Sequence, residues 1–88
     1  DGCIINEFGI KMWQGPLYME VVEEPLANIS SADEARKFPF PDPLAAGRFD
    51  DAKKYIEKYK DDYFIIGDLE LTMFEMAWHM VGMEKFLI

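Results

Sequence analysis

The sequence predicts a mixed α/β chain, which as an isolated piece has the segregated order of an α+β fold. Short apolar runs separated by turn residues fill the first 24 positions and predict a small antiparallel β-meander. Residues 25–61 carry helical patterns around a proline-rich connector. Residues 62–88 read as one strand–helix unit, so the helix, strand and helix order of the second half is that of an α/β repeat.

The predicted sheet consists of three short strands within residues 1–24. Strands are expected at Cys3–Ile5 and Phe8–Trp13, joined at Asn6-Glu7. Gln14-Gly15-Pro16 is a turn signal, and a third strand is expected at Leu17–Val22.

Two helices are expected in residues 25–61. Ser31 and Glu34 fit a capping box, which satisfies backbone amides at a helix start. This helix must be short, because the alternate prolines that follow disfavour helix in the residues before them: Pro39, Pro41 and Pro43. An amphipathic helix then follows Gly47, with apolar residues at three- and four-residue spacing: Phe49, Ala52, Ile56 and Tyr59.

The last part of the chain is strongly apolar. A strand is expected at Tyr63–Gly67, and helical spacing runs from Leu71 to Leu87. This helix is apolar on two sides, and one side is a methionine face of Met73, Met76, Met80 and Met83. Polar residues interrupt the run well short of the ~18 apolar residues of a membrane span. The helix therefore needs protein partners, either in a homo-oligomer or in missing segments of a larger domain.

Composition excludes several classes of function. The formal net charge is −8, so attraction to a phosphate backbone is absent and nucleic acid is not expected as a partner. Cys3 is the only cysteine, which excludes an internal disulfide framework. The first residues lack the pattern of a secretory signal, and a cytoplasmic location is expected.

Several separated stretches, taken in order, resemble one family: Asn6-Glu7-Phe8-Gly9 with Trp13, Pro25-Leu26-Ala27, Phe38 to Pro43 with Gly47-Arg48-Phe49, Phe74-Glu75-Met76-Ala77-Trp78, Gly82-Met83-Glu84 and Phe86-Leu87. They resemble the uroporphyrinogen decarboxylase superfamily, which includes the corrinoid-dependent methyltransferases. The resemblance implies a (β/α)8 TIM barrel of about 250 residues. The chain would then be a fragment, a single segment of a barrel domain, and the complete reading frame is expected to extend on both sides.

The resemblance also implies an activity for the complete protein. It would decarboxylate a tetrapyrrole side chain or transfer a methyl group to or from a corrinoid, as a carboxy-lyase or a methyltransferase. A methyltransferase-like enzyme would use corrinoid and zinc, and a decarboxylase-like one would need no cofactor. The isolated 88 residues are not expected to be competent. The rival prediction is a non-catalytic, oligomeric interaction module that uses the methionine face.

The candidate site residues lie at the end of the predicted strand and on the polar stripe of the apolar helix. His79 stands where the decarboxylases carry a functional tyrosine, and Glu75, one turn earlier, is placed to orient it. Asp68 is the third catalytic candidate, and Gly67 and Trp78 are substrate-binding candidates. Each candidate also has a purely structural alternative. Glu75 and His79 would form a salt bridge, Asp68 would start a helix, and Trp78 would pack in the core. Two ligands are too few for a metal site.

The resemblance has two departures that bear on the reaction. Bulky residues at Leu69–Leu71 replace a loop that is often glycine-rich in the family, and His79 replaces the tyrosine. Both favour the methyltransferase-like branch over porphyrinogen decarboxylation.

Overall fold

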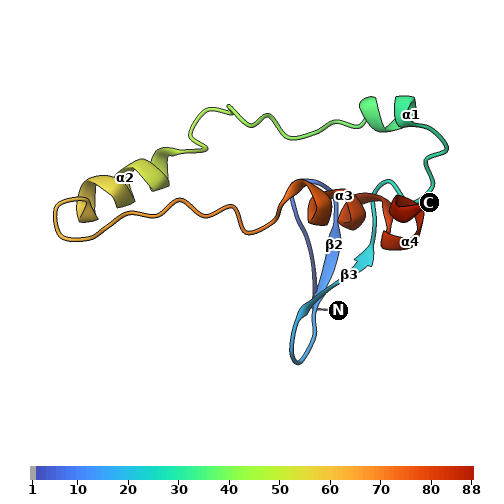
Figure 1. Cartoon of the computed structure of the whole chain (residues 1–88), viewed down its shortest axis with the longest axis horizontal. Helices are drawn as coiled ribbons and strands as arrows, with labels where there is room; N and C mark the ends of the chain where they lie inside the picture. Colours follow the sequence, from blue (N-terminus) through green and yellow to red (C-terminus); the bar gives the residue numbers. More distant parts are fainter. Residues whose placement is uncertain (1) are drawn as a thin grey trace. The chain divides into compact units, whose positions relative to one another are not determined.

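The computed structural model of the chain describes residues 2–88 and divides them into two compact units. The first unit combines residues 2–40 with residues 71–88, and the second consists of residues 41–70. The described residues form a three-stranded sheet and four helices (Figure 1). The mixed α and β content agrees with the predicted class. The third predicted part, residues 62–88, is divided between the two units.

The sheet of the first unit is an antiparallel meander with the order β1-β2-β3, as predicted. Its strands are β1 (Cys3–Ile5), β2 (Lys11–Gln14) and β3 (Met19–Glu23). Ile4 lies opposite Met12 in the first pair, and Trp13 lies opposite Glu20 in the second.

The second strand begins later than the predicted Phe8, because the chain turns between Asn6 and Ile10. The Asn6 Oδ1 atom accepts hydrogen bonds from the backbone amides of Phe8 and Ile10, each at 3.0 Å. Gly9 has a φ of 77° within this turn, a conformation that glycine adopts without strain. An Asn side chain that bonds to the following backbone favours a turn over a strand.

The core of the first unit is small and joins the two ends of the sequence. Ile10, Leu26 and Met80 are 0%, 7% and 4% exposed, and they form one cluster. The backbone amide of Leu26 donates a hydrogen bond of 2.8 Å to the carbonyl of Met80. Partly buried hydrophobic side chains surround the cluster: Phe8, Met12, Val21, Ile29, Ala35, Phe38, Met76 and Val81.

The first helix, α1 (Ala32–Arg36), begins at the predicted Ser31 cap. The Ser31 hydroxyl accepts from the Glu34 amide at 3.3 Å. The Glu34 carboxylate, however, accepts from the amide and hydroxyl of Ser30, at 2.9 and 2.7 Å. The predicted capping box is therefore correct for Ser31 and wrong by one residue for the partner of Glu34.

The second helix, α2 (Asp50–Tyr59), confirms the amphipathic helix predicted after Gly47. Asp50 and Asp51 occupy its first turn and Lys58 its last, which complements the helix dipole. It contains no buried residue.

The long apolar helix predicted from Leu71 to Leu87 is broken in the structure. It forms two helices, α3 (Met73–Val81) and α4 (Met83–Leu87), separated by Gly82. Gly82 has φ 89° and ψ 141°, and its amide donates to the Trp78 carbonyl at 2.8 Å. The backbone leaves the helical region at this glycine, which ends α3.

The strand predicted at Tyr63–Gly67 is not formed: these residues are irregular in the structure. A strand exists only where its backbone groups pair with a neighbour. Phe64 and Ile66 are 91% and 78% exposed. The described residues thus contain no strand–helix unit of a barrel, and the only sheet within residues 2–88 is the antiparallel meander.

Truncation of Met80 tests the core. Met80→Ala should lower the free energy of unfolding by about 2–5 kcal/mol, because it leaves a cavity beside Ile10 and Leu26. Met73→Ala is the matched control: Met73 is 92% exposed, and a change within about 0.5 kcal/mol is expected. Urea denaturation of both variants measures the difference, and equal losses would contradict the assignment of Met80 to the core.

Gly82→Ala tests the break between α3 and α4. An alanine at this positive φ should cost about 1–3 kcal/mol of folding free energy. Gly67→Ala is the control, because Gly67 does not have a positive φ and an added Cβ there meets no atom within 4 Å. A Gly82 variant as stable as the Gly67 variant in thermal unfolding would show that the break does not need glycine.

Glu34 should make α1 sensitive to acid. Hydrogen bonds from the Ser30 amide and hydroxyl lower the pKa of Glu34 below its ordinary value of 4.5. A lowered pKa means that the contribution of the carboxylate to stability is present above the ordinary pKa and is lost as pH falls through the folded pKa. Side-chain NMR titration should find this lowered pKa, and Ser30→Ala should raise it. The Ser30 amide remains in that variant, so an unchanged pKa would contradict only the contribution assigned to the hydroxyl.

Candidate functional site

Glu75 lies in the first turn of α3, where it closes a capping box with Thr72. The Thr72 amide donates to Glu75 Oε2 at 3.2 Å, and the Thr72 hydroxyl donates to the same oxygen. These bonds satisfy backbone and side-chain donors at a helix start. The Glu75 carboxylate is therefore hydrogen-bonded to Thr72, the residue that precedes α3.

His79 lies one turn after Glu75 and is partly buried. Its ring centroid is 4.0 Å from that of Trp78, with the two rings nearly perpendicular at 88°. Within the described part of the chain, no hydrogen bond joins His79 to Glu75. In this structure Glu75 bonds to Thr72 and His79 contacts Trp78, and the orienting role of Glu75 stays a prediction.

Gly67 and Asp68 lie in the second unit, in the irregular segment between α2 and α3. Both are exposed. Gly67 lines a hollow of about 320 Å³ with apolar residues of α2 and of the segment itself: Ala52, Tyr55, Ile56, Ile65 and Ile66. The predicted site residues therefore fall into two groups, with Glu75, Trp78 and His79 in the first unit.

The methionine face is divided between core and surface. Met80 is buried and Met76 packs against the core, whereas Met73 is almost fully exposed. Met73, Met76 and Met80 border a groove of about 460 Å³, whose other lining residues are also uncharged: Leu26, Phe40, Leu71, Thr72 and Ala77. The chain's own sheet and connector therefore cover part of the face that the sequence assigns to a partner.

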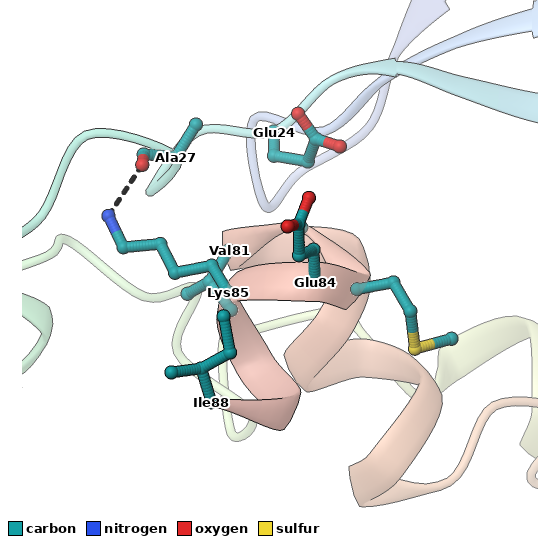
Figure 2. Close-up of a pocket in the computed structure, with 8 residues that line it drawn as sticks. Glu24, Ala27, Val81, Glu84, Lys85 and Ile88 are labelled. Atoms are coloured by element: carbon teal, nitrogen blue, oxygen red, sulfur yellow. Dashed lines mark hydrogen bonds between the residues drawn. The ribbon is translucent and has the colours of Figure 1, made fainter.

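A second hollow of the first unit was not predicted (Figure 2). It measures about 510 Å³ and is lined by three charged residues, Glu24, Glu84 and Lys85, together with Ala27, Val81, Gly82, Met83 and Ile88. Lys85 Nζ donates to the Ala27 carbonyl at 2.6 Å, which fastens α4 to the segment after β3. In the sequence, two motifs of the family resemblance contain residues of this hollow: Pro25-Leu26-Ala27 and Gly82-Met83-Glu84. Two carboxylates beside one engaged lysine suit a cationic group more than an anion.

Neither a metal cluster nor a membrane helix is found in residues 2–88. These residues contain no group of three or more His, Cys, Asp or Glu side chains that could hold a metal ion. None of their helices is long and apolar enough to cross a bilayer.

Comparison of the chain with protein-family models, with curated proteins and with solved structures finds no match in any of the three.

The role of Thr72 can be tested by two substitutions. Thr72→Ala should cost about 1 kcal/mol of folding free energy, because the Glu75 backbone amide and carboxylate lose the Thr72 hydroxyl. Thr72→Ser keeps the hydroxyl and should retain most of the stability. Chemical denaturation measures both variants, and an alanine variant as stable as the serine variant would show that the box contributes nothing.

Proposed function

We propose that the chain is a segment of an enzyme of the uroporphyrinogen decarboxylase type, on the methyltransferase-like side of that superfamily. In the complete protein it would act in corrinoid-linked methyl transfer or in tetrapyrrole-related decarboxylation. The motifs that support this run in the family's order from Asn6 to Leu87. The 88 residues alone are not competent, since a barrel site is assembled from several strands.

The observation that carries the proposal is the exposed apolar segment Tyr63–Ile66. Four consecutive large apolar residues are typical of a strand buried on both faces, as in a parallel barrel sheet. Here Phe64 is 91% exposed and the segment has no strand partner among the described residues. Such a segment is what a barrel strand becomes when its neighbours are not part of the chain.

The apolar face of α2 supports the same proposal. Tyr55 and Ile56 are exposed, although their spacing is that of a helix packed on a core. In a barrel, the helices form an outer ring against the strands. The missing strands would cover both α2 and Tyr63–Ile66.

The polar residues near the end of the proposed strand are the chemical candidates. Gly67 and Asp68 follow Tyr63–Ile66 directly, at the carboxyl end, where barrel enzymes place their active sites. His79 is the proposed proton donor or acceptor, because its ordinary pKa lies close to neutral pH. Glu75 and Thr72 would position α3 rather than react, since their side chains bond to each other.

The cofactor of the complete enzyme would be held elsewhere. Zinc needs three or four nitrogen, sulfur or oxygen ligands, and residues 2–88 do not fit such a site. No zinc ligand is therefore assigned among residues 2–88. Trp78 in the first unit and Gly67 in the second are each kept as a separate proposed contact of a tetrapyrrole or corrinoid-linked substrate.

The flanking sequence and the activity of the complete protein test this proposal. The reading frame should continue on both sides into further strand–helix units. The complete protein should either decarboxylate a porphyrinogen or exchange a methyl group with a corrinoid in a direct assay. A start codon just before Asp1 with a stop just after Ile88 would overturn the proposal, as would inactivity in both assays.

His79→Phe tests the proposed chemistry within the complete protein. The phenyl ring fills a similar volume but cannot transfer a proton, so turnover should fall by about 10²-fold or more. Met73→Ala, on the exposed side of the same helix, is the control and should leave turnover unchanged. Normal turnover in the phenylalanine variant would assign His79 to structure.

An oligomeric interaction module is the second candidate function. It is favoured by one observation: Met73 is 92% exposed beside a groove with no charged lining residue. A stable oligomer in light scattering that Met73→Glu dissociates would support it. A monomer at all concentrations would exclude it.

A further inference from the structure

The first unit contains the buried core of the chain. Ile10, Leu26 and Met80 all belong to it. Contacts between distant positions close it: the Leu26 amide bonds to the Met80 carbonyl, and Lys85 Nζ bonds to the Ala27 carbonyl. Residues 2–40 and 71–88 are thus joined by side chains and backbone from both segments. Such long-range contacts are characteristic of cooperatively folded units.

The second unit is built differently. None of the side chains of residues 41–70 is buried. Its hydrogen bonds include short-range ones such as Arg48 Nε to the Asp42 carbonyl, six residues apart, and the Tyr63 amide to the Tyr59 carbonyl. Segments with few buried contacts and local bonds open at low cost.

The only helix of the second unit is too short to be stable without cover. α2 has 10 residues, and isolated helices below about 12–15 residues are marginal in water. Two exposed ion pairs, Lys54–Asp51 and Lys60–Glu57, add little because water and salt screen them. The Tyr55 and Tyr59 rings meet at a tilt and the Tyr59 and Tyr63 rings edge to face, with centroids 4.9 and 5.8 Å apart, but Tyr55 and Tyr63 stay 67% exposed.

We infer that residues 41–70 are a conformational device: an insertion that unfolds and refolds locally while the core of the first unit stays folded. Opening frees the backbone of Tyr63–Ile66 from its present conformation. In a complete barrel, the freed segment would pair as a strand. That consequence rests on the proposed function, whereas the independent opening does not.

Hydrogen exchange of the 88-residue chain, followed by mass spectrometry, tests the inference. Amides of α2 should exchange within about tenfold of the unstructured rate, and those of β2 and α3 about 10²-fold or more slowly. Equal protection of α2 and α3 would overturn the inference. Loss of protection in β2 and α3 would overturn it as well, because the core would not be folded.

A matched pair of substitutions separates the two units. Ile10→Ala should lower the midpoint of thermal unfolding, because Ile10 is fully buried. Ile56→Ala, on the apolar face of α2, should leave the midpoint unchanged. A decrease in the Ile56 variant as large as in the Ile10 variant would show that α2 unfolds with the core.

Replacement of the insertion gives the second readout. A Gly-Ser linker of equal length in place of residues 41–70 should preserve the unfolding transition of the first unit. Loss of that transition would overturn the inference. These experiments use the 88-residue chain alone, without flanking sequence or substrate, so their failure is distinct from failure of the proposed function.

Discussion

The contact between Leu26 and Met80 is the constraint on which the rest of the first unit depends. A backbone hydrogen bond of 2.8 Å and the burial of both side chains beside Ile10 join the segment after β3 to α3. Because this bond links residues more than fifty positions apart, it holds the three-stranded sheet against a helix from the end of the chain. A sheet of three short strands needs such a packing partner for stability.

The core is too small for the apolar residues that the chain carries. Half of the residues are hydrophobic, yet Ile10, Leu26 and Met80 are the only buried hydrophobic residues in the described part. Exposed large hydrophobic side chains are found at Tyr63–Ile66, on α2 and at Met73. Exposed apolar surface of this extent marks an interaction site more often than a free surface.

Sequence patterns predicted the elements that depend on local interactions. The meander follows from apolar runs and from turn residues such as Gly15. Ser31 marks the start of α1, because its hydroxyl accepts a hydrogen bond from the amide of Glu34, three residues later. The prediction was wrong where the local structure depends on a neighbouring strand or on the backbone angle of one residue. Tyr63–Ile66 needs a neighbouring strand, and the φ of Gly82 interrupts a helical pattern that continues on both sides.

The candidate site shows the same limit. The spacing of Glu75 and His79 fits an interaction across one helical turn, and the spacing of Thr72 and Glu75 fits a capping box. Both patterns were present in the sequence, and only the second forms in the structure. Amides at a helix start have no intrahelical acceptor, so a carboxylate within reach is bound there first. The i, i+4 pattern alone therefore does not identify a catalytic pair.

This assignment changes what the polar stripe of α3 can contribute to chemistry. With the Glu75 carboxylate bound to Thr72, His79 has no carboxylate partner on its own helix and contacts the Trp78 ring instead. A histidine without a fixed partner is free to choose either ring nitrogen as donor. An orienting group for His79 must then come from another element. In the proposed barrel, the ends of neighbouring strands converge on one face and supply such groups, whereas an interaction module would leave the ring packed on Trp78.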